Sequence, residues 1–308
     1  AHCFAGQLNT SLHKKLFILH ASKIANEYIC TMEKVSNILP YFKKELFSVS
    51  NEREIASWAY ITLEHLLGYN RSDCILNSDK NITTKISDKI INIVIELKTN
   101  KPLQYILGET EFYGLKFKVN EQTLIPRPET EELVHWILQE EFSSALDVGT
   151  GSGCIPIVLA KNTNATISAI DVSEKALTIA RENAKVNRVE VNFILQDILK
   201  TTILPKVDLI ISNPPYVMDK EKELMQENVL NYEPELALFV SEDNPLLFYR
   251  KIAELAFVSL NENGKLFFEI NEQFGQEIIE LLSNIGFVDI ELKKDINDKD
   301  RMIKAIKK

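Results

Sequence analysis

The chain has 308 residues, a formal net charge of −9 at neutral pH and four cysteines. This length supports more than one domain and a large core, and no apolar run approaches the length that spans a membrane. The cysteines show no Cys-x-x-Cys spacing, so neither a disulfide scaffold nor a metal site is expected. The acidic balance argues against extended nucleic-acid binding, which depends on a basic face.

Residues 1–31 differ from the remainder of the chain. They begin without methionine, and Lys14 and Lys15 precede only a short apolar run, which is unlike a signal peptide. We expect this segment to be a leader, a tag or an upstream translation artefact. Met32 then opens the part that is expected to fold.

Residues 32–100 predict a small helical domain. Asn51 followed by Glu54 is typical of a helix N-terminus. A second helix is expected near Ser87 to Lys98. The side chains that share one face of the first helix, at spacings of three and four residues, are Ile55, Trp58, Ala59, Thr62, Leu63, Leu66 and Leu67.

Residues 101–125 predict a β-hairpin that links two domains. Its strand-like runs, 111–113 and 115–119, turn at Gly114. From residue 126 to 308, apolar strands alternate with helical segments. This alternation predicts an α/β domain with a mostly parallel sheet and helices on both faces.

A glycine-rich turn follows the apolar strand 145–148 and leads into a helix over 155–160. Strand, glycine turn and helix form the first unit of nucleotide-binding α/β sheets. Cys154 stands where the dinucleotide fingerprint needs glycine, which weakens a pyrophosphate site, and no Gly-Lys-Ser/Thr follows for a P-loop. The residues of the turn, expected to contact a nucleoside cofactor, are Gly149, Thr150, Gly151, Ser152 and Gly153.

Acidic residues follow the next two predicted strands. Asp171 lies about 20 residues beyond the glycine turn, where a carboxylate can accept from both ribose hydroxyls. Ser173 is available to cap the following helix, which would free Asp171 for the ligand. After the third strand, Asp197 is expected to accept from an adenine amine and Ile198 to cover the ring. A loop that binds no ligand is the alternative for this last pair.

The segment Asn213-Pro214-Pro215-Tyr216 follows an apolar run, 207–212, that predicts a buried strand. A residue before proline is pushed toward extended backbone, and the two prolines supply no N–H donor. The corner therefore presents acceptors, the Asn213 side-chain oxygen and the Pro214 carbonyl, which suit a planar NH2 group. It indicates chemistry on an amide or exocyclic amine nitrogen, with a purely structural Pro-Pro turn as the alternative.

Several further motifs accompany the glycine turn and this corner. They are Pro102-Leu-Gln-Tyr-Ile-Leu-Gly108, Phe112-Tyr-Gly114, Leu124-Ile-Pro-Arg-Pro-Glu-Thr-Glu131 and Tyr232-Glu-Pro-Glu-Leu-Ala-Leu238. Together they resemble the glutamine N5-methyltransferases of bacterial peptide chain release factors, the PrmC/HemK family, over nearly all of residues 32 to 308. Two departures are Asn271, where the family usually has glycine, and Ile198, where some relatives carry an aromatic residue.

The resemblance implies a Rossmann-like class I S-adenosylmethionine-dependent methyltransferase domain, preceded by a small helical domain and a hairpin. S-adenosylmethionine is the implied cofactor, and the implied partners are class 1 release factors whose Gly-Gly-Gln loop carries the glutamine. Asn213 and Pro214 would orient the acceptor amide, beside Pro215, while Tyr216 would pack against its plane. The helical domain would help to hold the protein substrate. We expect a cytoplasmic monomer without a metal.

Two other functions fit parts of the pattern. An N-methyltransferase acting on adenine or cytosine in nucleic acid would meet the same NH2 geometry, although the acidic balance speaks against it. A non-catalytic nucleoside-binding module would need no acceptor corner at all.

Within the site, Glu129 and Glu131 have two interpretations. They frame the acceptor pocket, or they are acids near the positive end of a helix that starts at Thr130.

Overall fold

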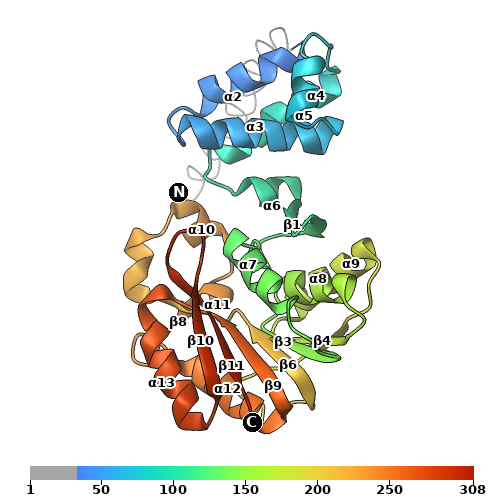
Figure 1. Cartoon of the computed structure of the whole chain (residues 1–308). Coiled ribbons are helices and arrows are strands. Elements are labelled where there is room, and N and C mark those ends of the chain that lie inside the picture. The colour runs from blue at the N-terminus through green and yellow to red at the C-terminus, as the bar shows by residue number, and fades with distance from the viewer. Residues whose placement is uncertain (1–32) are drawn as a thin grey trace, which may run out of the picture. The chain divides into compact units, whose positions relative to one another are not determined.

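The computed structural model describes residues 33–308, so the expected leader at 1–31 lies outside the described residues. The chain divides between Leu107 and Gly108 into two compact units (Figure 1). From residue 33 to the C-terminus, no helix combines the length and the apolar character needed to cross a bilayer.

The first unit is built from helices. Helix α3 (Glu52–Leu67) begins after Asn51, whose side-chain oxygen accepts from the Glu54 amide at 3.0 Å, as the sequence predicts. It ends at Gly68, whose φ of 70° is strained for any residue with a β-carbon. The buried side of α3, which includes Ile55, packs into this unit's own hydrophobic cluster. The other elements are η1 (Val35–Asn37), α2 (Ile38–Leu46), α4 (Arg71–Leu76), α5 (Thr84–Leu97) and α6 (Leu103–Leu107).

The second unit opens with a hairpin. Strands β1 (Glu109–Phe112) and β2 (Leu115–Lys118) pair antiparallel. Tyr113 and Gly114, in the turn, have φ values of 51° and 71°. Two positive φ values characterise the two-residue turns whose twist matches that of the flanking strands.

One buried asparagine ties this hairpin to the sheet domain. Asn183 lies on α9 (Glu174–Asn187) and is 0% exposed. Its side-chain oxygen accepts from the Lys118 amide at 2.6 Å, and its NH2 donates to the carbonyls of Lys118 at 3.0 Å and Ser152 at 2.9 Å. A single side chain therefore joins β2 to the glycine-rich turn.

Seven strands form the central sheet of the second unit: β3 (Ser144–Val148), β4 (Thr166–Asp171), β5 (Asn192–Leu195), β6 (Val207–Ser212), β9 (Leu260–Glu269), β10 (Val288–Lys294) and β11 (Asp300–Ile306). Their order is β10-β11-β9-β6-β3-β4-β5. Every neighbouring pair is parallel except the two pairs made by β11. The predicted α/β class with a mostly parallel sheet is confirmed.

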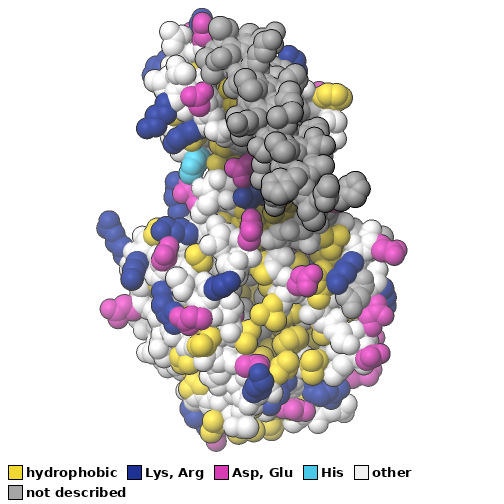
Figure 2. All heavy atoms as spheres, turned by 180° about the vertical axis from the view of Figure 1, so that it is seen from behind, with side chains coloured by type: hydrophobic (Ala, Val, Ile, Leu, Met, Phe, Trp, Pro, Cys, Tyr) yellow, Lys and Arg dark blue, Asp and Glu magenta, His cyan; other side chains and the backbone are white. Residues whose placement is uncertain are grey.

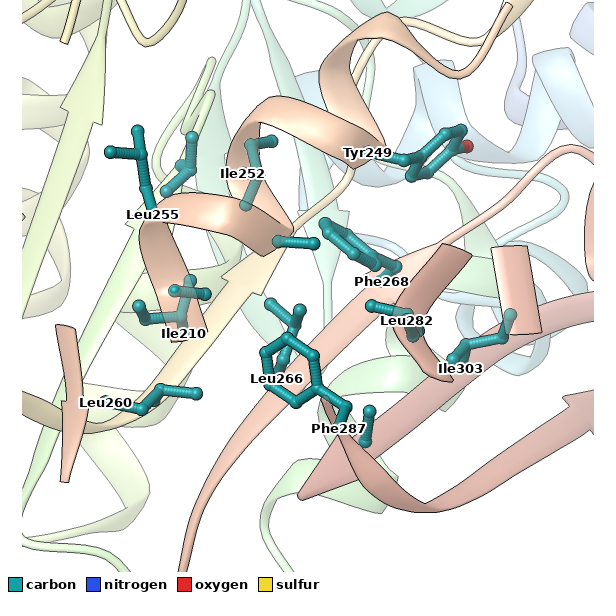
Figure 3. Packing of buried hydrophobic residues seen from close by; sticks show 14 of the residues in the cluster. Ile210, Tyr249, Ile252, Leu255, Leu260, Leu266, Phe268, Leu282, Phe287 and Ile303 are labelled. Atoms are coloured by element: carbon teal, nitrogen blue, oxygen red, sulfur yellow. The ribbon is translucent and has the colours of Figure 1, made fainter. Parts of the chain in front are cut away.

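Helices cover both faces of this sheet. They are α7 (Pro128–Ile137), α8 (Cys154–Asn162), α9, α12 (Leu247–Ser259) and α13 (Gly275–Ile285). Ala145 belongs to the hydrophobic cluster beneath α7 and α8, while its neighbour Leu146 belongs to the cluster beneath α12 and α13. Successive side chains of a strand point to opposite faces, so a strand buried on both faces is apolar throughout. In the second cluster the Tyr249 ring packs edge-on against Phe268 at 5.3 Å (Figure 3).

Short elements occupy the segment between β6 and α12, with one more after β9. They are β7 (Val217–Met218), η2 (Asp219–Leu224), α10 (Glu227–Tyr232), α11 (Glu235–Leu238), β8 (Phe239–Val240) and η3 (Glu272–Phe274). Strands β7 and β8 pair in parallel. Strand β7 directly follows Asn213-Pro214-Pro215-Tyr216.

Replacing Asn183 by alanine should destabilise the protein, because it leaves the buried groups of Lys118 without partners. Each unpaired buried donor or acceptor costs on the order of 1–3 kcal/mol, so the urea midpoint should fall clearly. The exposed Asn192→Ala on β5 is the control and should unfold like the wild type. Equal midpoints for both variants would contradict the role assigned to Asn183.

Candidate active site

Three adjacent parallel strands end at one cavity in the second unit. Val148 of β3 pairs with Ile170 of β4 and Ser212 of β6, so the next residue of each strand stands at the same level. The cavity there has a volume of about 450 Å³. The predicted site residues that line it are Gly149, Thr150, Gly151, Ser152, Asp171, Asp197, Ile198, Asn213, Pro214 and Pro215. Two expected members, Gly153 and Tyr216, are not part of this lining.

The glycine-rich turn forms one wall of the cavity. The amides of Gly149 and Thr150 donate to the Ile170 carbonyl at 2.9 and 3.1 Å, which joins the turn to β4. Gly149 and Gly151 have φ values of 78° and 55°, and a β-carbon added at either would meet nothing within 4 Å. Glycine is therefore required there for backbone conformation, and its missing side chain leaves room for a ligand.

Gly153 is not part of the cavity lining, and its expected contact with a cofactor stays a prediction. It is the N-cap of α8, with a φ of 80°. A β-carbon there would lie 3.0 Å from the Ala180 β-carbon and 3.1 Å from Ile157. Its role is the close approach of α8 to α9.

Asp171 ends β4 at the cavity, where the sequence places it. Ser173 caps α9 by accepting from the Ala176 amide at 3.2 Å. Asp171 is nevertheless not free, because its oxygens accept from the amides of Gly151 at 2.8 Å and Ser173 at 2.9 Å. Burial raises the pKa of Asp171, and these two amides oppose the rise. A carboxylate has about four lone-pair sites, so Asp171 can still accept from a ligand.

Asp197 and Ile198 line the cavity beyond β5. One oxygen of Asp197 accepts from the Leu199 amide at 3.0 Å, and the other pairs with Lys200 at 2.9 Å. The Lys200 ammonium lowers the pKa of Asp197. Ile198 packs against the hydrophobic cluster beneath α12, to which Phe248 also contributes a cavity-lining ring. This end of the cavity therefore combines an acceptor with apolar walls.

The Asn-Pro-Pro-Tyr corner forms the opposite wall. The Asn213 NH2 lies 3.4 Å from the Thr130 hydroxyl. Tyr216 is not part of the cavity lining, and its hydroxyl donates to Glu269 at 3.3 Å. Its expected place against a substrate amide stays a prediction. Burial is the main cause that raises the pKa of Tyr216, so the phenol stays protonated.

Thr130 and Glu269 were missed as site residues by sequence reasoning. The Thr130 hydroxyl donates to Glu269 at 2.6 Å, and the two side chains are 3% and 1% exposed. Burial raises the pKa of the Glu269 carboxyl. The available signal was an acidic residue at the end of the apolar strand 266–268.

Asp147 is a second buried carboxyl that sequence reasoning passed over. It lies on β3, 1% exposed, and neither oxygen hydrogen-bonds to another described residue. Burial raises its pKa to about 7, and the nearby charge of Asp171 contributes to the rise. Across residues 33–308, no three His, Cys, Asp or Glu side chains are grouped as a metal site.

Two of the sequence motifs meet through one ion pair. Arg127, from the 124–131 motif, pairs with Glu233, from the 232–238 motif, at 2.7 Å. The Glu233 side chain is 2% exposed, and it also accepts from the Ile125 amide at 3.4 Å. Arg127 lines the cavity, so this pair holds a cationic side chain at its wall.

Glu129 and Glu131 occupy the first turn of α7, which begins at Pro128 and not at Thr130. Glu131 accepts from the Tyr113 amide at 2.6 Å and so fastens the hairpin turn. Neither glutamate belongs to the cavity lining. The structure therefore favours the interpretation that they are acids at a helix N-terminus.

The chain matches two protein families along most of its described length. Residues 129–235 match the family described as methyltransferase small domain. Residues 39–108 match the family described as PrmC N-terminal domain. A solved structure, a methyltransferase from Pyrococcus furiosus, is 19% identical with a TM-score of 0.50, and the match covers 73% of this chain and 99% of that chain. The predicted class I methyltransferase fold is confirmed.

Curated relatives give a closer match. The chain is 50% identical over 280 residues to a release factor glutamine methyltransferase of Flavobacterium psychrophilum, covering 88% of this chain and 98% of that protein. It is 41% identical over 276 residues to the protein of the same name in Bacteroides thetaiotaomicron, covering 88% and 99%. These identities over nearly complete chains confirm the resemblance inferred from the motifs. The chain belongs to the release factor glutamine methyltransferases, a family of S-adenosylmethionine-dependent enzymes.

Proposed function

We propose that this protein transfers a methyl group from S-adenosylmethionine to the side-chain amide nitrogen, N5, of the Gly-Gly-Gln glutamine in class 1 release factors. One observation carries the proposal: a single cavity is lined both by the glycine turn with Asp171 and by Asn213 with Pro214. A nucleoside and an amide can therefore meet within one site.

The residues present fit a nucleoside cofactor. Asp171 can still accept from a ribose hydroxyl, and Gly149 and Gly151 present no side chain where a ligand must approach. Ile198 and Phe248 supply apolar walls for the adenine ring, and Asp197 supplies an acceptor. S-adenosylmethionine, when bound, supplies an electrophilic methyl group on a positively charged sulfur.

The acceptor corner prepares the amide nitrogen. An amide nitrogen is a poor nucleophile because its lone pair is delocalised into the carbonyl. The Asn213 oxygen and the Pro214 carbonyl grip both hydrogens of the NH2 group and turn the nitrogen toward the methyl group. The C–N bond would form as the bond between the methyl carbon and the cofactor sulfur breaks. The nitrogen would then lose its proton to water, so no strong base is needed beforehand. Such positioning can contribute about 7–11 kcal/mol.

The alternative substrate, an exocyclic amine in nucleic acid, finds less support. Nucleic-acid enzymes usually carry a continuous basic surface. On the face shown in Figure 2, lysine and arginine side chains are interspersed with acidic ones, and the net charge is −9.

We propose that the helical part, 32–100, helps to hold a release factor while 126–308 carries out methyl transfer. The monomeric state and cytoplasmic location remain predictions.

Asp171→Ala should weaken S-adenosylmethionine binding more than tenfold, because a hydrogen bond to a charged group is worth about 1.5–3 kcal/mol. Isothermal titration calorimetry measures this affinity. Asp88→Ala, at an exposed position of α5, is the control and should bind normally. Unchanged affinity in a folded Asp171→Ala protein would remove Asp171 from the cofactor site.

Methyl transfer should require a folded release factor and should survive nuclease treatment of the reaction. The physical reason is the net charge of −9, which disfavours the extended phosphate contacts that nucleic-acid binding depends on. Tritiated methyl groups, followed into protein, DNA and RNA separately, measure the outcome. Label in nucleic acid and none in the release factor would favour the alternative function.

Asn213→Ala should lower turnover on the order of a hundredfold, because the substrate amide is no longer oriented by the Asn213 oxygen. The affinity for the cofactor should change much less. Asn213→Asp keeps an acceptor oxygen but adds a buried charge that costs free energy, so it should retain partial activity. Steady-state kinetics on both variants make the comparison. Near-wild-type turnover in both would reduce Asn213 to a residue that merely precedes a Pro-Pro turn.

A further inference from the structure

A chain of hydrogen bonds runs behind the acceptor corner. The Asn213 NH2 lies 3.4 Å from the Thr130 hydroxyl, which lies 2.6 Å from one oxygen of Glu269. The other Glu269 oxygen accepts from the Tyr216 hydroxyl at 3.3 Å. The four groups come from the end of β6, from α7, from the end of β9 and from the segment before β7. One carboxyl therefore braces both the first and the last residue of the Asn-Pro-Pro-Tyr corner.

The number of hydrogens sets the direction of this chain. A hydroxyl has one hydrogen to donate, and an ionised carboxylate can only accept. Thr130 gives its hydrogen to Glu269 in the short contact, so toward Asn213 it can only accept. The Asn213 amide must then turn its NH2 group to Thr130. Its side-chain oxygen is left to face away from Thr130, as the acceptor for a ligand.

We propose that Thr130 and Glu269 are positioning residues that set which end of the Asn213 amide is presented to the substrate. The inference rests on the proposed methylation of an amide nitrogen, for which the corner must offer an oxygen and not an NH2 group. A reversed Asn213 amide would place two donors against the substrate NH2 group, which also has only hydrogens to give. The buried carboxyl of Glu269 therefore fixes which end of the Asn213 amide, the oxygen or the NH2 group, faces the substrate.

The relay depends on the charge of Glu269. Burial raises the pKa of this carboxyl, while the Thr130 hydroxyl and the positive charge of Arg301 lower it. Below that pKa the carboxyl carries a hydrogen, so the Thr130 hydroxyl can accept from it and does not have to donate. The Asn213 amide can then turn either its oxygen or its NH2 group toward Thr130. Three other titratable groups interact with the Glu269 carboxyl: Glu129 on α7, Cys154 on α8, and Tyr216 in the segment before β7. In addition, the Tyr249 hydroxyl on α12 donates to the Glu269 backbone carbonyl at 3.3 Å.

A double-mutant cycle tests whether Thr130 acts through Asn213. Thr130→Val removes the hydroxyl at nearly constant volume and should lower kcat about ten- to a hundredfold, with S-adenosylmethionine affinity nearly unchanged. Thr130→Ser restores the hydroxyl and should restore most of kcat. In an Asn213→Ala background, Thr130→Val should cost nothing further, because residues that act through one another are non-additive. Thr62→Val, at a buried threonine of α3, is the control for loss of a buried hydroxyl.

A second measurement does not depend on activity. In nitrogen-15 NMR spectra of the intact protein, the Asn213 side-chain NH2 signals should shift with pH at the same midpoint as the Glu269 carboxyl carbon. Thr130→Val and Glu269→Gln should abolish that shift, whereas Thr130→Ser and Thr62→Val should preserve it.

The two proposals fail in different ways. The relay would be overturned, even in an enzyme that methylates release factors, by kcat losses for Thr130→Val and Asn213→Ala that add in the double variant. It would also be overturned if the pH-dependent shift of the Asn213 NH2 signals stayed the same in both Thr130→Val and Glu269→Gln. Lack of methyl transfer to a release factor by the wild type would instead overturn the proposed function. The NMR titration would then decide the relay by itself.

Discussion

The register between β3 and its two parallel neighbours is the constraint on which the site depends. Val148 stands opposite both Ile170 and Ser212, so the glycine turn, Asp171 and Asn213 leave the sheet at one level. A shift of one residue would turn these side chains to the other face of the sheet. The register is held by strands that are apolar on both faces, whose alternate side chains enter two separate hydrophobic clusters.

The polar groups that break this apolar pattern gather at the carboxyl ends of the strands. Asp147 and Glu269 are both buried, and burial raises the pKa of each. Burying a carboxylate costs free energy unless it is paired, and here Glu269 has two hydroxyl partners while Asp147 has none among the described residues. A cost of this kind at a ligand site is typical of groups held for function. The corner is therefore braced by a buried carboxyl that accepts from both Thr130 and Tyr216.

Local sequence patterns predicted much of this arrangement. The glycine turn, Asp171 at a strand end and the Asn213 corner each depend on neighbouring residues alone, and the structure brings them to one cavity. The Thr130–Glu269 bond spans 139 residues and the Arg127–Glu233 bond spans 106, so no local pattern announces them. Gly153 and Tyr216 were expected on the cavity because they belong to its motifs. Neither lines the cavity: Gly153 allows the close approach of α8 to α9, and the Tyr216 hydroxyl donates to the buried Glu269 carboxyl.

Tandem mass spectrometry of a release factor after incubation with the enzyme and S-adenosylmethionine tests the central claim most directly. The account predicts one added methyl group per release factor, located on the side-chain amide nitrogen of the glutamine in its Gly-Gly-Gln loop. Fragment ions that place the methyl group on a carboxylate oxygen, on a lysine or on any other residue would contradict the claim that the acceptor corner selects an amide NH2 group.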